Sequence, residues 1–376
     1  MREPSKRQIE NAISQFDIWG KVINHRWHGN GHINDTRLIT VQRDDGQIVY
    51  FILQMMNTSV FTKPVELMEN IIAVTKFIKA KVIARGGDIE REVVNVIPTK
   101  DGCSYYVDKE GNFWRLLEYI SGATSYDSVD DPEIFKASAY AFGRFQNDLS
   151  DFPIDKLHET IPNFHNTESR YAAFEKSVEK DIAKRKSTCE REIELLLERK
   201  PLAQYFNKLL AEKKIPLRVT HNDTKLNNVM IDDTTHKGLC VIDLDTVMPG
   251  ISCFDFGDAI RFGANTAAED ETDLSKVSIS KELFTAFTEG FIEGCGGRLT
   301  SEEIDSLYLG AMEMTYEVAL RFLADYLDGD TYFRIDHPSH NLERARCQIA
   351  LLLDMEKKRS EMEEVVQELK KKYKSF

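Results

Sequence analysis

Short apolar runs separated by polar turns dominate the first third of the chain. Apolar and β-branched residues cluster at 38–41, 48–53 and 113–119, and Asp-Asp-Gly, Lys-Asp-Gly and Lys-Glu-Gly-Asn sequences lie between them. Runs of this length, bounded by glycine and aspartate, are typical of strands joined by turns. From Pro64 to Ile78, however, apolar residues recur at helical spacing, and proline suits the first position of a helix. We therefore predict a small sheet interrupted by one helix.

The pattern becomes helical from Ile134 onward. Only two strand-like runs interrupt it, and they frame a polar loop. Because 376 residues exceed the size of one typical core, two lobes are the default expectation. The sequence therefore predicts an α+β protein with a small sheet lobe at 1–120 and a larger, mainly helical lobe at 121–376, joined near Gly122. The charged run at 357–374 is interpreted as the solvated face of a helix.

The composition narrows the range of partners. The formal net charge of −13 argues against a nucleic-acid partner and against an anionic membrane surface, since both attract basic proteins. The charged start of the chain does not resemble an apolar signal core, and no apolar run approaches the roughly 18 residues of a membrane span. The six cysteines are dispersed without a Cys-x-x-Cys pair. We expect reduced thiols and a cytoplasmic location.

The polar loop at 219–228 carries the candidate chemistry. It contains His221, Asp223 and Asn228 in the pattern H-x-D-x-x-x-x-N, and Asp243 follows at the end of an apolar run. Phosphoryl transfer from a nucleotide requires a carboxylate beside the acceptor hydroxyl and oxygen ligands that hold Mg²⁺ on the phosphates. Asp223 is the candidate for the first role, and Asn228 and Asp243 are the candidates for the second. The alternative is a hairpin that carries an Asp and an Asn by chance, which leaves the spacing of the four elements unexplained.

Three neighbouring residues need separate interpretation. His221 ends a strand-like run, and we expect it to hold the loop through backbone hydrogen bonds. Asp245 would share a face with Asp243 if the segment is extended, which makes it a candidate ligand of a second metal or of the substrate; a plain structural carboxylate is the alternative. Asp255 begins a literal Asp-Phe-Gly, but it lies too far from Asp223 and follows a turn rather than a strand. We therefore expect Asp255 to be structural.

Beyond this loop, the chain resembles the aminoglycoside phosphotransferase and choline kinase superfamily, which shares the bilobal protein-kinase-like fold. The closer resemblance, across nearly the whole length, is to bacterial N-acetylhexosamine 1-kinases. It is carried by blocks of sequence at 29–34, 53–58, 220–228, 242–250, 254–258, 260–264 and 321–326. The resemblance implies transfer of the γ-phosphoryl group of ATP to the anomeric hydroxyl of N-acetylglucosamine or N-acetylgalactosamine, with Mg²⁺ as the metal.

The nucleotide is expected on the sheet lobe. Gly29 and Gly31 lack a Cβ, so the loop that ends at Asn34 can bring backbone amides close to phosphates. A simple hairpin turn is the alternative for this short motif. By resemblance, the backbone N–H and C=O groups from Glu118 to Ile120 read the adenine.

One phosphate-binding position departs from the superfamily. Gln54 stands on the third strand, where most of the superfamily has a lysine for the nucleotide phosphates. Lys225, two residues after Asp223, is the available substitute, because its point charge can approach the γ-phosphate. The alternative is a surface lysine that pairs with an acidic neighbour.

The acceptor is expected near the helix predicted at 307–327. This helix is largely apolar, yet Glu317, Arg321 and Asp325 recur every four residues along one stripe. Charged groups on a buried helix must be paired or must meet a ligand. One interpretation is a ladder of these three side chains that satisfies itself; the other places Arg321 at the mouth of a pocket, where it binds sugar oxygens. The resemblance favours the second interpretation and adds three further sugar neighbours, His32, Thr246 and Tyr332.

Two rival functions remain open. A kinase of the same fold that acts on choline, homoserine, methylthioribose or an aminoglycoside would keep Asp223, Asn228 and Asp243 but change the acceptor pocket. A catalytically silent binding protein would have lost at least one of these three residues, and all three are present.

Overall fold

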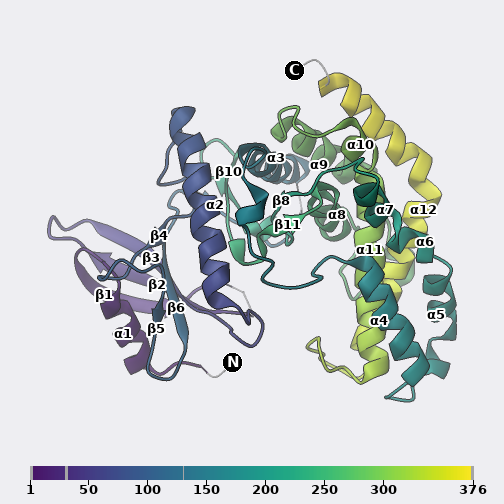
Figure 1. Ribbon diagram of the computed structural model, residues 1–376, viewed down its shortest axis with the longest axis horizontal. Coiled ribbons are helices and arrows are strands. Elements are labelled where there is room, and N and C mark those ends of the chain that lie inside the picture. Colours follow the sequence, from purple (N-terminus) through teal and green to yellow (C-terminus); the bar gives the residue numbers. More distant parts are fainter. Residues whose placement is uncertain (1–2, 30–32, 130, 374–376) are drawn as a thin grey trace.

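The protein has two lobes, a small one built around a sheet and a larger helical one (Figure 1). The structure is a computed structural model that describes residues 3–29, 33–129 and 131–373. This architecture is the α+β bilobal fold that the sequence predicts. The apolar runs expected to be strands lie in β2, β3 and β6, which confirms those assignments.

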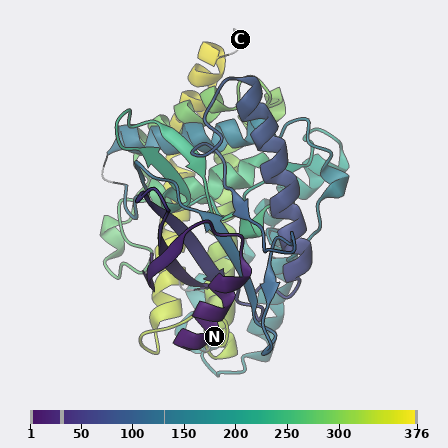
Figure 2. The ribbon, with the colours of Figure 1, turned by 90° about the vertical axis from the view of Figure 1, so that its left-hand side faces the viewer.

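The first lobe combines an antiparallel sheet with two helices. In chain order its elements are α1 (Lys6–Gln15), β1 (Lys21–Trp27), β2 (Asp35–Gln42), β3 (Ile48–Met55), α2 (Pro64–Ala84), β4 (Val96–Ile97), β5 (Tyr106–Val107) and β6 (Phe113–Glu118). The strands pair in the order β1-β2-β3-β6-β4, and β5 also pairs with β6. Figure 2 views the molecule from the left-hand side of Figure 1, and from there the sheet lies in front of the helical lobe.

The first helix, α1, was not among the predicted elements of the sheet lobe, so the prediction of one helix in this lobe was incomplete. Its apolar positions Ile9, Ile13 and Phe16 follow helical spacing and are buried against the sheet. Ser5 and Gln8 form a capping box that satisfies the first amide groups of the helix. The capping residues and the apolar stripe together explain why a helix forms here.

The second helix, α2, connects the two lobes. It begins at Pro64, as predicted, and continues to Ala84. Its buried residues, among them Leu67, Met68 and Val74, belong to the same apolar cluster as the helices of the second lobe. In Figure 1 this helix stands between the sheet and the helical lobe. Buried apolar surface, the dominant favourable term in such packing, therefore holds α2 against the helical lobe, whereas the buried residues of the sheet and α1 form a separate cluster.

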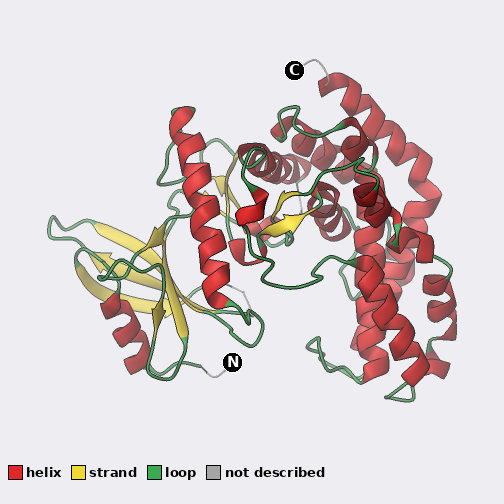
Figure 3. Cartoon of the chain, viewed as in Figure 1, coloured by secondary structure: helices red, strands yellow, loops and turns green. Residues whose placement is uncertain are grey.

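The second lobe is mainly helical (Figure 3). Its α-helices are α3 (Pro132–Asp148), α4 (Thr167–Lys180), α5 (Glu190–Leu197), α6 (Lys200–Ala203), α7 (Tyr205–Ala211), α8 (Ser252–Gly263), α9 (Lys281–Gly294), α10 (Ser301–Asp305), α11 (Leu307–Asp328) and α12 (His340–Tyr373). Its strands are β7 (Ala123–Thr124), β8 (Arg218–Thr220), β9 (Val229–Asp232), β10 (Gly238–Val241) and β11 (Met248–Gly250). Short 3₁₀ helices include η3 (Leu226–Asn228) and η4 (Leu244–Thr246).

The strands around the polar loop are more numerous than the two that the sequence predicts. β8 pairs with β11, while β9 pairs with both β10 and β7. Each of these strands contains four residues or fewer, so none is long enough to display an alternating pattern. These pairings place the loop between β8 and β9 next to the segment between β10 and β11.

Helices α8 and α11 approach each other at two glycines. A Cβ on Gly257 would lie 2.4 Å from the carbonyl oxygen of Gly310, and a Cβ on Gly310 would lie 2.3 Å from that of Cys253. Any larger residue would force the helices apart. The close contact fixes α8, which carries Asp255, against α11, which carries Glu317 and Arg321.

Candidate active site

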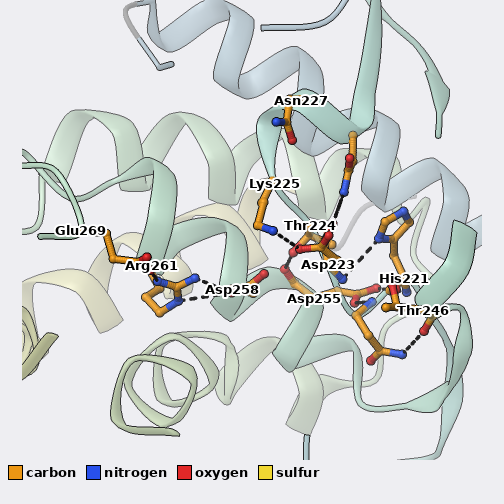
Figure 4. Close-up of polar contacts among 12 residues, drawn as sticks. His221, Asp223, Thr224, Lys225, Asn227, Thr246, Asp255, Asp258, Arg261 and Glu269 are labelled. Carbon is orange, nitrogen blue, oxygen red and sulfur yellow. Dashed lines mark hydrogen bonds and ion pairs between the residues drawn. The ribbon is translucent and has the colours of Figure 1, made fainter. Parts of the chain in front are cut away.

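The loop after β8 is anchored by the carboxylate of Asp255 (Figure 4). One carboxylate oxygen accepts from the backbone N–H of His221 at 2.9 Å and from Gln146 at 2.7 Å, and the other accepts from the backbone N–H of Asn222 at 2.7 Å. Thr224 also donates its hydroxyl to the Asp255 carbonyl. Asp255 is 1% exposed, and burial raises the pKa of its carboxyl. Both carboxylate oxygens are used to hold the loop, as expected for a structural residue.

His221 and Asn222 complete the scaffold of the loop. The His221 ring is buried, with Nε2 2.9 Å from the Ile242 carbonyl oxygen, and its Nδ1 accepts from the backbone N–H of Asp223 at 3.3 Å. Asn222 has a positive φ of 65°, a conformation that asparagine tolerates better than most residues. Its side chain donates to the Thr246 carbonyl at 2.9 Å. His221 thus holds the loop through backbone contacts, which confirms the expectation from the sequence.

Asp223 lies between a cation and an amide. One carboxylate oxygen is 2.8 Å from Lys225 Nζ, and the other accepts from Asn228 Nδ2 at 3.3 Å. The Asp223 side chain remains 27% exposed, so its carboxylate is accessible to an acceptor. Burial lowers the pKa of Lys225, but the facing Asp223 carboxylate and the nearby Asp258 outweigh this effect and raise it. The lysine therefore stays protonated beside Asp223.

Asn228 and Asp243 are suited to a divalent cation. Asn228 directs its amide N–H groups to the backbone carbonyl of Asp223 at 2.8 Å and to its carboxylate, so its amide oxygen faces elsewhere. Asp243 has a positive φ of 57°. Although part of the Asp243 surface is exposed, the surrounding protein displaces water from the carboxyl group. This desolvation, together with the negative charges of Asp245 and Asp223, raises the pKa of Asp243 to about 6. A cation bound there would offset the crowded negative charge.

The donor set fits Mg²⁺ held jointly by protein and nucleotide. Mg²⁺ is commonly bound through one or two carboxylates plus substrate phosphates rather than by an all-protein cage. The described part of the chain contains no cluster of three or more histidine, cysteine or acidic side chains that could hold a metal ion.

Asp245, the third candidate metal residue, is already engaged by the sheet lobe. It is 3% exposed, and one carboxylate oxygen accepts from Arg115 while the other accepts from Asn34 at 2.9 Å. Asp245 lies in η4 rather than on an extended strand, so the shared face with Asp243 expected from the sequence does not form. Arg115 was not recognised in the sequence, because a single arginine in an apolar run carries no motif.

The nucleotide-binding candidates lie on the sheet and at its exit. Gly29 has a positive φ of 77° and open space where a Cβ would project, whereas Gly31 and His32 lie outside the described residues. Asn34 and Gln54 both join the Arg115 network, since Asn34 contacts Asp245 and Gln54 contacts Arg115 at 2.8 Å.

The backbone groups predicted to read adenine lie at the end of β6. The backbone N–H groups of Glu118 and Tyr119 donate to the carbonyls of Asn95 and Tyr50 at 2.9 and 3.3 Å. Within the described residues, no group accepts from the N–H of Ile120. Burial, and secondarily Glu90, raises the pKa of the Glu118 carboxyl. Of the three predicted backbone donors, two are therefore already hydrogen-bonded within the protein.

The charged stripe on α11 is not a ladder that satisfies itself. Glu317 is fully buried and accepts from His165, 3.0 Å away, and from Thr167 at 2.8 Å. Asp325 accepts instead from the backbone N–H groups of residues 331–333 and from the Asn341 side chain. The ladder interpretation is therefore wrong: each carboxylate has partners on other elements, which sequence spacing within one helix cannot reveal.

Arg321 is left facing aromatic rings. Its guanidinium carbon lies 5.8 Å from the ring centre of Tyr332 and 5.4 Å from that of Phe333, and Tyr332 is 71% exposed. Close by, Arg170 donates to the Phe164 carbonyl at 3.2 Å, but its buried Nε has no hydrogen-bond partner among the described residues. Burial and then the charge of Arg321 lower the pKa of Arg170. Arg170 was also missed in the sequence, since it lies in no motif.

His165 connects this basic region to the catalytic loop. One ring nitrogen lies 3.0 Å from Glu317 and the other lies 3.0 Å from the backbone carbonyl of Asn222, the residue before Asp223. Thr246, a further candidate sugar neighbour, donates its hydroxyl to the His221 carbonyl at 2.7 Å, so it also supports the loop. His165 therefore joins α11 to the catalytic loop beside Asp223.

Comparison with known proteins adds a family to this geometry. Residues 80–276, more than half of the chain, match the phosphotransferase enzyme family. The chain belongs to this family. The matched region contains the catalytic loop and Asp243, whereas Arg321 and Tyr332 lie beyond it. The phosphotransferase class of activity follows from the family, but two of the candidate acceptor residues, Arg321 and Tyr332, are outside the match.

Solved structures agree on the fold of this phosphotransferase. An aminoglycoside phosphotransferase from Alicyclobacillus acidocaldarius is similar with a TM-score of 0.60 at 14% identity, covering 100% of this chain and 98% of the other. An amicoumacin kinase in complex with AMP-PNP, Ca²⁺ and Ami gives a TM-score of 0.60 at 12% identity, with 92% and 93% covered. A choline kinase from Cryptosporidium parvum gives 0.57 at 12% identity, with 95% and 96% covered.

The solved structures that match are kinases of small molecules, and this phosphotransferase shares their fold. The predicted class of reaction, phosphoryl transfer, is supported by the family match. No helix in the described ranges is both long and apolar enough to cross a membrane.

Proposed function

We propose that this phosphotransferase transfers the γ-phosphoryl group of ATP to the anomeric hydroxyl of a 2-acetamido-2-deoxyhexose, N-acetylglucosamine or N-acetylgalactosamine. The sheet lobe (1–120) would hold the nucleotide and the helical lobe (121–376) the sugar. The observation that carries the proposal is the accessible Asp223 carboxylate, which lies between Lys225 and Asn228. Asn228 and Asp243 supply oxygen donors of the kind that Mg²⁺ prefers.

The chemistry requires few protein groups. Asp223 orients the sugar hydroxyl, whose oxygen forms a bond to the γ-phosphorus while the bond to the bridging β–γ oxygen breaks and ADP leaves. The hydroxyl proton passes to Asp223 late in the transfer. Lys225 is close enough to offset developing phosphate charge, and Asn228 and Asp243 would hold Mg²⁺, which neutralises the phosphates.

The charge of the acceptor region favours a neutral polyol over the cationic rivals. Among the described residues, neither Arg170 nor Arg321 forms an ion pair, although the Glu317 carboxylate acts on both charges, and their mutual repulsion contributes to the lowered pKa of Arg170. Choline or an aminoglycoside would add positive charge beside two guanidinium groups. An N-acetylated sugar carries no charge and offers oxygens that guanidinium forks can bind.

A panel assay tests the proposal. The enzyme is incubated with ATP, Mg²⁺ and each of N-acetylglucosamine, N-acetylgalactosamine, glucosamine, choline and homoserine, with Asp223→Asn as the inactive control. We expect ADP release with the acetylated sugars, and phosphorus coupling to the anomeric proton of the product. Phosphate on the 6-hydroxyl alone contradicts the regiochemistry, and rapid turnover of choline or homoserine without sugar turnover assigns the enzyme to a rival class.

A further inference from the structure

Three polar residues form a row across the sheet of the first lobe. Thr36 on β2 is paired in register with Gln54 on β3, and Gln54 is paired with Arg115 on β6. Residues directly opposite each other on neighbouring strands project from the same face. Gln54 accordingly donates to the Thr36 hydroxyl at 3.1 Å and accepts from Arg115 Nε at 2.8 Å. The row ends at the arginine, so Gln54 serves to orient the guanidinium.

The arginine at the end of the row reaches into the other lobe. Arg115 Nη1 donates to Asp245, whose second carboxylate oxygen accepts from Asn34 at 2.9 Å. Arg115 is 2% exposed and Asp245 is 3% exposed. A buried ion pair adds little net stability compared with apolar residues of similar volume, because both charges lose their hydration. Its presence between lobes therefore indicates a role beyond packing.

The guanidinium also lies within electrostatic range of the metal-binding candidate. Asp245 follows Asp243 by two residues, and the charge of Arg115 acts to lower the pKa of Asp243. Arg115 Nη2 has no hydrogen-bond partner among the described residues. One face of the guanidinium is thus fixed by Gln54 and Asp245, while one nitrogen remains available beside the predicted position of the nucleotide phosphates.

We propose that Arg115 is a second nucleotide-phosphate-binding cation of this enzyme, in addition to Lys225, and that Asp245 holds it in place across the two lobes. In kinases with a strand lysine, the lysine and its glutamate partner both belong to the first lobe. Here an arginine on β6 takes the place of the lysine absent at Gln54, and its partner comes from the catalytic lobe. The ion pair thereby holds the sheet and the Asp243 segment at fixed positions relative to each other, on either side of the phosphates. The inference rests on ATP as the co-substrate in the proposed function, but not on the identity of the acceptor.

A series of nucleotides that differ only in phosphate number tests the role. Adenosine, AMP, ADP and a non-hydrolysable ATP analogue are titrated into the protein by calorimetry, with and without Mg²⁺. For Arg115→Met we expect unchanged adenosine affinity and a loss of about 10- to 100-fold for ADP and the ATP analogue, since a hydrogen bond to a charged group is removed. Arg115→Lys should recover part of this loss, because it restores the charge without the fork.

A second arginine–aspartate pair in the same sheet provides the control. Arg37 on β2 is nearly buried and lies 2.7 Å from Asp35, but it neighbours Thr36 in sequence and so projects from the opposite face. Arg37→Met should affect melting temperature without changing the dependence of affinity on phosphate number.

The outcomes separate this inference from the proposed function. If Arg115→Met weakens adenosine and ATP equally, or weakens neither, the residue does not bind phosphate and the inference is wrong. If Arg115→Met does not fold, Arg115→Gln decides, because glutamine keeps a hydrogen-bonding side chain without the charge: unchanged affinity for every nucleotide overturns the role, and a loss confined to ADP and the ATP analogue supports it. A wild-type protein that binds no nucleotide removes the proposed function as well, whereas failure of the sugar panel alone leaves this inference intact.

Discussion

Replacing Asp255 with alanine should lower the stability of the protein but leave its candidate metal ligands, Asn228 and Asp243, in place. The carboxylate accepts from two backbone N–H groups and one side-chain amide, all at buried positions. Removing the acceptor leaves three donors unsatisfied, at about 1–3 kcal/mol each, and related buried charge deletions cost about 3–5 kcal/mol in total. In a chain of 376 residues, that loss lowers the melting temperature by roughly 4–6 °C.

Asp243→Asn is the matched variant for comparison. Asparagine tolerates the positive φ of residue 243, so the change adds little backbone strain. It removes one of the crowded carboxylates whose mutual repulsion contributes to the raised pKa of Asp243. We expect the nucleotide-free variant to be at least as stable as wild type, yet to lose Mg²⁺-dependent nucleotide binding and turnover.

The two variants are compared by thermal and urea unfolding and by nucleotide titration with and without Mg²⁺. The reasoning requires opposite profiles: lost stability with retained metal dependence for Asp255→Ala, and retained stability with lost metal dependence for Asp243→Asn. An Asp255→Ala protein that melts within 2 °C of wild type but loses Mg²⁺ dependence would refute it, as would a nucleotide complex in which Asp255 coordinates the metal.

Three further changes test the site. Asp223→Asn should lower kcat by about 10²- to 10⁴-fold while nucleotide affinity stays near wild type, and a variant that keeps more than a few per cent of turnover would contradict the base assignment. Lys225→Ala should lower kcat by more than roughly tenfold, about 1.4 kcal/mol of barrier; wild-type kinetics would reduce Lys225 to a surface charge. His165→Gln should flatten the pH dependence of stability. Burial lowers the pKa of His165, but the effect of the Glu317 carboxylate is larger, so the net pKa is raised. The contribution of His165 to the free energy of unfolding is therefore complete below pH 6.5 and is lost as pH rises through the pKa of the folded state. Burial raises the pKa of Glu317, but the effect of His165 is larger, so the net pKa is lowered. The contribution of Glu317 to the free energy of unfolding is therefore present above pH 4.5 and is lost as pH falls through the pKa of the folded state. Urea unfolding from pH 5 to 9 measures the difference, and parallel curves for variant and wild type would exclude the pair as its source.

The sequence by itself determined the elements whose signal is local. Short apolar runs bounded by turn residues located β2, β3 and β6, and apolar residues at helical spacing located α2. The spacing of Asp223, Asn228 and Asp243 likewise indicated the chemistry, since a catalytic loop is one short continuous segment. Local patterns of this kind need no knowledge of what packs against them.

Only the tertiary structure decided which groups from distant segments meet. Arg115 and Asp245 are separated by 130 residues in the chain, and His165 and Glu317 by 152, so no periodicity relates them. The Glu317, Arg321 and Asp325 stripe shows the converse: correct helical spacing suggested mutual pairing, yet two of the three side chains found partners on other elements. A buried charge is stabilised by whichever complementary group packing brings within hydrogen-bond distance, and that choice is made by the fold, not by position along one helix.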